Sequence, residues 1–361
     1  ILKIIRKLIY ILTIPKKTKQ KIEMSQDEVK KFLYDITPIP NGKIETNNKI
    51  VPQIDLSIIV AAYNVDQCIK SLLQQETKYQ YEIIIVNDGS TDETLQKIMK
   101  YSYDNRIIII DQDNKGLSGA RNIAIAQMKG KYVTFVDADD YMLPNAIENF
   151  LDIAYQKNAD IVEGSAFSFF DNGKLSRRFK HKEKIKQVNP VKEFLGYPWG
   201  KVYKSKIFEK YHFPEGYLFE DTIFAMFIYP LCKECWTIGS NVYAYRVNKN
   251  GITQKAKANK RSIESQWITE YLLNQQFKEK IFSVDTYNQF LDQIAMNYSR
   301  TKELGNEVKE ALFLENRNLY FEYYEKYKFK PEGYKKRKLE KYLKESNKDK
   351  ALHLLKYWDS L

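Results

Sequence analysis

The sequence predicts an α/β domain with a mainly parallel sheet, followed by an all-helical C-terminal module. Four apolar runs, which begin near Leu56, Glu82, Arg106 and Lys131, alternate with stretches of helical periodicity. Continuous apolar runs of this kind are typical of parallel strands that are buried on both faces of a sheet. From Lys255 onward the strand pattern stops and only helical periodicity remains.

The 361 residues divide into three predicted parts. Residues 1–50 hold a basic amphipathic helix and a turn-rich lead-in, residues 51–254 form the α/β domain, and residues 255–361 form the helical module with a basic stretch. A hydrophobic share of 43% is ordinary for a globular protein, and the length is ample for a sizeable core.

Three cysteines, Cys68, Cys232 and Cys235, are too few for a disulfide framework and fit a reducing compartment. Cys232 and Cys235 form a CxxC pair, but a zinc site needs two further Cys or His ligands at suitable spacing, and the three histidines are scattered. We therefore interpret the pair as the buried end of a helix that runs into a strand.

The net charge of +12 is concentrated at the two ends of the chain. Residues 1–21 carry seven Lys or Arg and no acid, and residues 326–350 carry eleven Lys or Arg against four acids. The two ends together exceed the charge of the whole chain, so the part between them is slightly acidic. Basic ends suggest an anionic partner surface, either phospholipid or nucleic acid, although a charge run can also be a solvated face.

The segment Ile1–Pro15, ILKIIRKLIYILTIP, has the pattern of a basic amphipathic helix. Lys3, Arg6, Lys7 and Tyr10 recur at helical spacing, and Ile and Leu fill the opposite face. The run is too short to span a bilayer, which needs about 20 residues, and it lacks the order of a signal peptide. The pattern favours a helix in the headgroup plane, peripheral on the cytoplasmic side of the cell membrane. The alternative is a helix packed on the protein's own surface.

Polar residues and glycines follow each of the four predicted strands. In a parallel sheet the carboxyl ends of the strands meet at one rim, where ligands bind. No GxGxxG follows the first strand and no GxxxxGK[ST] occurs, so dinucleotide and P-loop phosphate binding are not supported. The rim residues are Tyr63 and Asn64 after the first strand, Asn87 to Ser90 after the second, Asn114 to Gly119 and Arg121 after the third, and Asp137 and Asp139 after the fourth.

The last of these segments, FVDADDYMLP, raises the question of what its carboxylates meet. Mg²⁺ and Mn²⁺ take one or two carboxylates and complete their coordination with water and diphosphate oxygens. An isolated DxD is more often a solvated loop, but here three other polar segments converge on the same rim. We expect Asp137 and Asp139 to hold Mg²⁺ or Mn²⁺, and the metal to hold a diphosphate.

Four stretches in this order carry a resemblance: SIIVAAYNVDQCIKSLLQQ, YEIIIVNDGSTDET, NKGLSGARNIAI and GKYVTFVDADDYMLP. Together they resemble the family 2 glycosyltransferases, which have the GT-A fold, a Rossmann-like, mainly parallel sheet. The match spans Leu56 to about Pro144 and continues more weakly to about Thr253. The resemblance implies transfer of a sugar from a nucleotide-diphosphate donor, with inversion at the anomeric carbon.

The resemblance also implies roles for single residues. Asp88 would accept a hydrogen bond from the donor's base, uracil in most cases, and Asp139 would be the main metal ligand. The implied donor-binding residues are Tyr63, Asp88, Gly116, Arg121, Asp137 and Arg246, and the implied metal ligands are Asp137 and Asp139.

On the acceptor side, Asp221 of FEDT matches the family's general base. An acceptor hydroxyl is a weak nucleophile at neutral pH, so a carboxylate must take its proton as the bond forms. Glu220, Trp199 and Lys201 are the other acceptor-side candidates. Simpler interpretations remain: Glu220 and Asp221 as acids at a helix N-terminus, and Trp199 as a core residue.

The expected partners are a nucleotide-sugar donor, UDP in most cases, and a glycan, lipid-linked or protein-linked acceptor, as in cell-surface polysaccharide or glycoconjugate synthesis. An anionic membrane surface is a further expected partner, and the C-terminal helices could mediate self-association. Two alternative functions are a membrane-tethered scaffold with an inactive transferase domain and a nucleic-acid-binding protein. Intact Asp88, Asp139 and Asp221 argue against the first, and the absence of a recognised nucleic-acid-binding module argues against the second.

Overall fold

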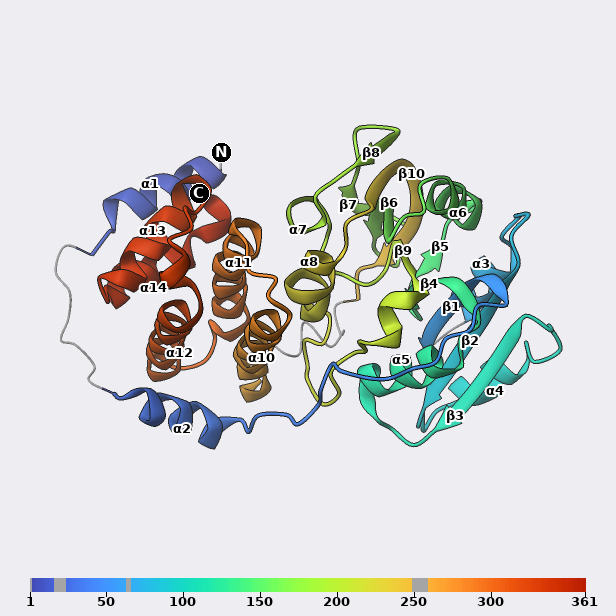
Figure 1. Ribbon diagram of the computed structural model, residues 1–361, viewed down its shortest axis with the longest axis horizontal. Coiled ribbons are helices and arrows are strands. Elements are labelled where there is room, and N and C mark those ends of the chain that lie inside the picture. The colour runs from blue at the N-terminus through green and yellow to red at the C-terminus, as the bar shows by residue number, and fades with distance from the viewer. Residues whose placement is uncertain (1, 16–23, 63–65, 249–258) are drawn as a thin grey trace. The chain divides into compact units, whose positions relative to one another are not determined.

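The computed structural model describes residues 2–15, 24–62, 66–248 and 259–361 (Figure 1). The chain forms two compact units. One, the sheet unit, comprises Asn41–Lys249, and the other, the helical unit, comprises Ile1–Pro40 together with Asn250–Leu361. The N-terminal segment therefore groups with the C-terminal helices, whereas residues 41–50 group with the sheet.

The sheet unit is built on one mixed sheet, with the strand order β3-β2-β1-β4-β9-β6-β10-β5, in which β7 pairs with β6 and β8 with β10. Strands β3, β2, β1 and β4 are parallel to one another, while β9 is antiparallel to both β4 and β6. The strands are β1 (Ile54–Ala62), β2 (Tyr81–Asp88), β3 (Ile107–Gln112), β4 (Gly130–Asp137), β5 (Tyr141–Met142), β6 (Ile161–Phe169), β7 (Leu175–Phe179), β8 (Ile185–Gln187), β9 (Lys201–Lys204) and β10 (Cys235–Arg246).

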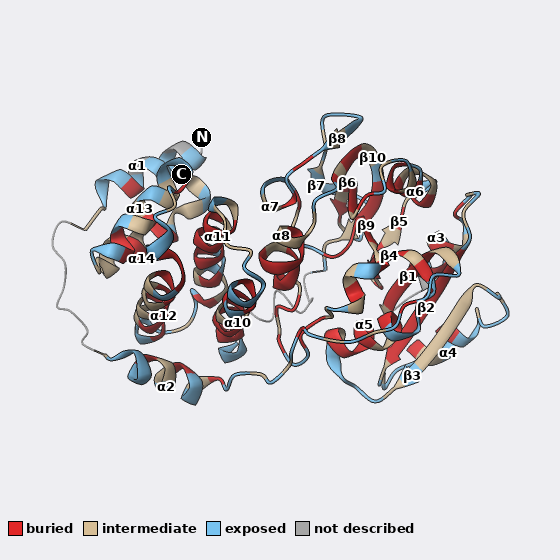
Figure 2. Ribbon diagram, in the orientation of Figure 1, coloured by how far each residue is buried: buried red, intermediate tan, exposed pale blue. Residues whose placement is uncertain are grey.

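Helices cover both faces of the parallel half of the sheet, where β1, β2 and β4 are mostly buried and the edge strand β3 is partly buried (Figure 2). Because side chains alternate along a strand, Ile58 and Val60 join the core of α3 and α6, and Ile59 lies on the opposite face, where α5 packs on β1 and β2. The helices of this unit are α3 (Asp66–Leu73), α4 (Thr94–Met99), α5 (Gly116–Gln127), α6 (Ala146–Gln156), α7 (Pro190–Glu193) and α8 (Tyr229–Leu231). The predicted α/β fold with parallel strands is confirmed.

Strand β10 contains an irregularity in its pairing with β6. Ile238 pairs with Gly164 and Tyr243 with Ala166, and the register shifts twice between these two pairs. Five steps along β10 therefore correspond to two along β6, which leaves three extra residues in β10. Bulges of this kind bend a strand and re-aim its side chains, and they are frequent next to active sites.

The helical unit contains no strand among residues 2–15, 24–36 and 259–361, which confirms the all-helical C-terminal module. Its α-helices are α1 (Leu2–Leu12), α2 (Gln26–Ile36), α10 (Glu264–Glu279), α11 (Val284–Thr301), α12 (Asn306–Leu319), α13 (Gly333–Lys344) and α14 (Lys348–Lys356). Within the described residues, no helix is both long enough and apolar enough to cross a bilayer.

Helix α2 is an integral part of the helical unit. Ser25 and Glu28 form a capping box at its start, and Val29 and Leu33 are fully buried. Just past its end, the carbonyl of Thr37 accepts a hydrogen bond of 2.9 Å from the indole of Trp267. The segment that the sequence suggests as a lead-in is therefore partly core.

Helix α1 contacts the helical unit through Tyr10, whereas Lys3, Arg6 and Lys7 of the same polar face are exposed. Tyr10 is 3% exposed, its ring stacks on that of His353 at 5.0 Å, and its carbonyl lies 3.0 Å from His353 Nε2. Ile5, Ile9 and Leu12, which share the apolar face, are exposed, Leu12 by 81%. The helix thus packs on its own protein, as the alternative interpretation has it, but presents an apolar stripe to the outside.

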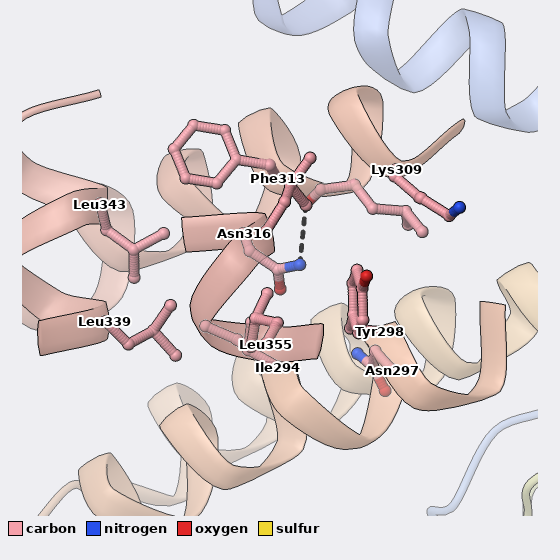
Figure 3. A pocket seen from close by; sticks show the side chains of 11 residues that line it. Ile294, Asn297, Tyr298, Lys309, Phe313, Asn316, Leu339, Leu343 and Leu355 are labelled. Carbon is pink, nitrogen blue, oxygen red and sulfur yellow. Dashed lines mark hydrogen bonds between the residues drawn. The ribbon is translucent and has the colours of Figure 1, made fainter. Parts of the chain in front are cut away.

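The interior of the helical unit holds a cavity of ≈ 10 Å³ between α11, α12, α13 and α14 (Figure 3). Leu339 and Leu343 line it together with Asn316, whose amide nitrogen donates to the carbonyl of Leu312 at 2.7 Å. A cavity of this size holds about one water molecule. A nucleotide or a sugar therefore cannot bind there.

Candidate active site

The carboxylate of Asp88 stands at the end of β2 and is held by its neighbours. Its Oδ1 accepts hydrogen bonds from Gln112 Nε2 at the end of β3 (2.7 Å) and from the backbone N–H of Lys115 (2.8 Å). Gly89 follows with φ +69°, and a Cβ there would meet the backbone nitrogen of Asn114 at 2.7 Å. Only glycine fits this turn, because both the conformation and the space exclude a side chain.

Gly116 opens α5 with φ +73°, and its N–H donates to the side chain of Asn114 at 3.2 Å. The turn places the first turn of α5 at the rim of the sheet, next to the ends of β2 and β3. Donor N–H groups at a helix start are suited to anionic groups of a ligand.

Arg121 of α5 is 3% exposed and bridges two acidic segments that lie far apart in the sequence. Its Nη2 is 2.9 Å from Asp137 Oδ1, and its Nη1 is 2.8 Å from Glu220 Oε1. Its guanidinium also lies over the ring of Phe213, 5.0 Å from the centroid. The structure therefore connects the acids after β4 with the FEDT segment through one buried cation.

Glu220 and Asp221 lie at the start of a helical segment that runs through a π-helix (Phe224–Ile228) into α8. Burial raises the pKa of Glu220 to about 7; the Arg121 guanidinium opposes this rise and the Asp221 carboxylate adds to it. Asp221 is half-buried, and its carbonyl accepts the N–H of Phe224 at 3.0 Å. Asp221 is thus the more exposed acid of the pair, while Glu220 is engaged by Arg121.

The three carboxylates that follow β4 differ in their surroundings. The side chain of Asp137 is 36% exposed, and Asp139 accepts a hydrogen bond from Asn248 Nδ2 at 3.1 Å. Asp140 is buried and accepts the Tyr243 hydroxyl and the Arg246 N–H, each at 2.7 Å. Burial, with Asp137 next, raises the pKa of Asp140 to about 8. Asp137 and Asp139 therefore form the accessible part of the segment.

Arg246, at the end of β10, reaches the same segment. Its Nε donates to the carbonyl of Asp139 at 2.9 Å, and its Nη1 pairs with Asp171 Oδ1 at 2.9 Å. The guanidinium lies over the ring of Phe169, 5.0 Å from the centroid. It therefore adds positive charge beside Asp139, at the place where the sequence analysis expects a diphosphate.

The residues at the rim fit a hard divalent cation. Two carboxylates, Asp137 and Asp139, follow the strand end two positions apart, and oxygen ligands are those that Mg²⁺ and Mn²⁺ prefer. Among the described residues, no group of three or more His, Cys, Asp or Glu side chains is arranged to hold a metal ion. A metal at this rim would accordingly take the rest of its coordination from water and the ligand.

Trp199 and Lys201 are both removed from the surface. Trp199 is 5% exposed and Lys201 1% exposed, with the Lys201 ammonium 2.7 Å from Glu163 Oε2. Burial lowers the pKa of Lys201, and the Glu163 carboxylate counteracts this effect. The expectation that Lys201 faces an acceptor or the diphosphate does not fit this placement; the ammonium lies behind the site, where it is paired.

Two predicted rim residues, Tyr63 and Asn64, lie outside the described residues, as does the end of the predicted domain from residue 249 onward. The sequence analysis also misses residues. Tyr243 contacts two of the aspartates, and Asn248 contacts Asp139. In the segment VYAYR, Tyr243 and Tyr245 alternate with other residues, which indicates that both lie on one face of a strand. Nothing local in the sequence links this face to the aspartates.

Comparison with known proteins identifies the domain. Residues 57–212 match the model of Glycosyl transferase family 2. The chain carries a family 2 glycosyltransferase domain. The matched residues include β1–β4, the acids after β4 and the Trp199 segment, so the predicted resemblance is confirmed.

Relatives of this glycosyltransferase domain occur in bacteria. The chain is 33% identical to glycosyltransferase GlyA of Streptococcus pneumoniae over 219 residues, which is 55% of this chain but 31% of GlyA. It is 28% identical to the putative glycosyltransferase EpsH of Bacillus subtilis over 260 residues, 68% of this chain and 75% of EpsH. The match thus spans less than a third of GlyA.

The fold of the chain is similar to that of a solved structure, S. aureus TarS 1-349 in complex with UDP-GlcNAc. The TM-score is 0.68, with 18% sequence identity, over 84% of this chain and 91% of the other. At this identity the likeness shows the fold. It supports the GT-A architecture that the sequence predicts for the glycosyltransferase domain.

Proposed function

We propose that the chain transfers a sugar, with inversion, from a UDP-sugar to a hydroxyl of a glycan, lipid-linked or protein-linked acceptor in the synthesis of a cell-surface glycoconjugate. The observation that carries the proposal is the bridge by Arg121. It holds Asp137 of the expected donor side and Glu220 of the expected acceptor side on one guanidinium. An in-line displacement needs these two sides next to each other, with the reacting carbon between them.

On the donor side, Asp88 would bind the uracil. Gln112 and Lys115 engage Oδ1 and orient the carboxylate, so that Oδ2 is placed to accept an N–H of the base. UDP as the nucleotide is supported by TarS, a structural neighbour solved with UDP-GlcNAc. Asp137 and Asp139 would hold Mg²⁺ or Mn²⁺, which when bound neutralises charge on the leaving diphosphate. Arg246 would add a second positive charge there.

On the acceptor side, Asp221 is the proposed base. Glu220 is bound by Arg121 and nearly buried, so it can orient the segment but is poorly placed to accept a proton from a ligand. Asp221 is more exposed and follows directly in the chain. A carboxylate in hydrogen-bond reach of the acceptor hydroxyl takes its proton as the hydroxyl attacks, and the nucleotide leaves from the opposite side.

The test compares Asp221→Asn with Glu220→Gln. We expect Asp221→Asn to keep UDP affinity, measured by calorimetry with Mg²⁺ or Mn²⁺, and to lose roughly two to four orders of magnitude in transfer rate. Glu220→Gln should lower thermal stability, because it removes one partner of a buried cation. If UDP binding collapses in Asp221→Asn, then Asp221 is a structural or donor-side residue and the assignment is wrong.

We also propose that α1 holds the enzyme on the cytoplasmic face of a membrane. Tyr10 fixes the helix to its own unit by the polar face, while Ile5, Ile9 and Leu12 stay exposed. An interfacial helix buries such a stripe among the acyl chains, and each nearby cation adds about 1 kcal/mol of attraction to anionic headgroups. A membrane-proximal acceptor would make this attachment useful.

Sedimentation with vesicles tests the attachment. The triple variant Ile5→Ser, Ile9→Ser, Leu12→Ser should lose binding to phosphatidylglycerol vesicles. A matched control, Tyr34→Ser with Ile39→Ser, removes exposed apolar side chains elsewhere in the unit and should bind as the wild type does. Binding of the wild type should weaken with salt without vanishing, because salt screens the cations but not the apolar contact. Equal sedimentation of the triple variant and the wild type would refute the anchor.

A further inference from the structure

The loop before β9 carries a stack of aromatic rings. Trp199 lies nearly parallel to Tyr197 (centroids 4.9 Å apart, planes at 6°) and to Tyr243 (4.8 Å, 9°), and it also stacks with Tyr245 at 5.4 Å. Phe179 meets Trp199 edge-on at 5.9 Å. Trp199 is covered by these neighbours, and Tyr197 is the exposed member of the stack, with 41% of its surface accessible.

The backbone of this loop is held along its length. A buried ion pair, Lys201 with Glu163, stands behind it, and His181 Nε2 contacts the other oxygen of Glu163 at 3.0 Å. Buried or part-buried donors bind the carbonyl groups of the loop. The Tyr229 hydroxyl donates to the carbonyl of Leu195 (2.7 Å), and the Lys201 ammonium donates to the carbonyls of Tyr197 (2.8 Å) and Trp199 (3.4 Å). The Tyr203 hydroxyl donates to the carbonyl of Pro198, and the N–H of Gly164 to that of Gly200, each at 3.0 Å.

The stack is joined to the acids at the rim. The Tyr243 hydroxyl donates to Asp140 at 2.7 Å and accepts the N–H of Asp137 at 3.1 Å. Burial raises the pKa of Tyr245 to about 12, and the carboxylates of Asp140 and Asp137 add to the rise. The aromatic loop and the proposed metal ligands are therefore parts of one connected framework.

We propose that Tyr197 is the platform for the sugar ring of the acceptor, and hence that the acceptor presents a pyranose at its reacting end. This inference rests on the proposed glycosyl transfer and names the acceptor class of that site. An aromatic ring offers a flat apolar face with a polar edge, and a pyranose offers a face of C–H groups to lie on it. Trp199 acts behind Tyr197 as a positioning residue.

The architecture explains why the exposed ring is held so firmly. A ring that is fixed before binding loses little freedom when a sugar lies on it, so more of the contact energy appears as affinity. The ion pair of Lys201 with Glu163, both at most 2% exposed, serves the same purpose. An acceptor that ends in an open-chain polyol has no flat face and gains nothing from this ring.

The experiment uses the full chain with three tyrosine variants: Tyr197→Ala, Tyr197→Phe and, as a control, Tyr103→Ala, which is 81% exposed and lies at the surface after α4. Saturation-transfer NMR with methyl β-D-glucopyranoside and methyl β-D-galactopyranoside, and with ribitol as the polyol probe, measures ring binding. UDP affinity and UDP-sugar hydrolysis without acceptor are measured alongside.

We expect the wild type, Tyr197→Phe and Tyr103→Ala to bind at least one glycoside and not ribitol. Tyr197→Ala should lose glycoside binding by about tenfold, with UDP affinity and hydrolysis unchanged. In transfer to the bound glycoside, KM should rise and kcat should change little. The proposal would be overturned if Tyr197→Ala bound the glycosides as well as the wild type does, or if the wild type bound ribitol as well as it binds the glycosides. Failure of the wild type to bind UDP contradicts the proposed function instead, and leaves the glycoside result to be judged separately.

Discussion

In the sheet unit, the buried guanidinium of Arg121 lies between two carboxylates at 2.8 and 2.9 Å. In the helical unit, the fully buried carboxylate of Glu315 has the ammonium of Lys30 at 3.8 Å, and Lys30 is closer to Glu270, at 2.5 Å. Burial raises the pKa of Glu315 to about 7, with Glu270 adding to the rise and Lys30 opposing it. Burial thus raises the pKa of a carboxyl group in both units, but Glu220 has a guanidinium at 2.8 Å, whereas Glu315 has an ammonium at 3.8 Å.

The difference shows what a buried charge is used for. Pairing a buried ion rarely increases stability over an apolar core, because desolvation offsets the attraction. Where a unit keeps such a pair with good geometry on both sides, as at Arg121, the pair fixes the relative position of segments that must act together. At Glu315 the ammonium of Lys30 is 3.8 Å away, so the pairing that opposes the effect of burial is looser.

The first prediction tests Asp139, the accessible carboxylate that we propose as a metal ligand. Asp139→Asn should lower the transfer rate by roughly two to four orders of magnitude, because several kcal/mol of charge stabilisation on the diphosphate depend on the metal. Thermal stability should stay near that of the wild type, since the side chain is only partly buried. Asp171→Asn, an exposed partner of Arg246, is the matched control and should change the rate by less than a few fold. Full activity of Asp139→Asn would refute the metal assignment.

The second prediction tests the buried centre. Arg121→Met leaves the carboxylates of Asp137 and Glu220 without their cation, and should lower the free energy of unfolding by about 3–5 kcal/mol. Lys186→Met removes an ion pair with Glu193 in which both side chains are 41% exposed, and should leave the free energy of unfolding nearly unchanged. Urea unfolding measures both. If the two variants lost similar amounts of unfolding free energy, burial of the Arg121 ion pairs would not contribute to stability.

The third prediction concerns Glu315, the more loosely paired acid. Because the folded-state pKa of Glu315 is raised, the folded chain binds this proton more tightly than the unfolded chain. Stability should therefore fall as the pH rises from about 4.5 to about 7, by on the order of 3 kcal/mol at most. Glu315→Gln should remove the contribution of this group to the slope, while Glu220 and Asp140, whose pKa values are also raised, keep theirs, and the variant should be more stable than the wild type at pH 8. Glu307→Gln, at an exposed position of α12, should keep the slope; its loss there would point to another group.

Local patterns in the sequence predict the fold and the members of the rim. The strands and the turns at Gly89 and Gly116 depend on neighbours along the chain, so they can be read from it. The partners across the fold cannot: Arg121 meets Glu220 ninety-nine positions later, and the burial of Lys201 depends on Glu163 in a different strand. The sequence offers Lys201 as an acceptor-side candidate, but the residue is buried, and its pairing with Glu163 is what allows a lysine to be buried at all.

The shifted pairing of β10 with β6 carries one more consequence. Three extra residues lie between Ile238 and Tyr243, and three is an odd number, so every side chain beyond them faces the side of the sheet opposite to the one that regular pairing would give. Tyr243, Tyr245 and Arg246 all lie beyond that point. The parity of the insertion, more than the identity of Gly239 or Ser240, thus aims the tyrosines at Trp199. Substitution of Ser240 should be tolerated, whereas a Cβ at Gly239 would lie 3.0 Å from the carbonyl oxygen of Glu183. Deletion of a single residue should turn the whole row of side chains around.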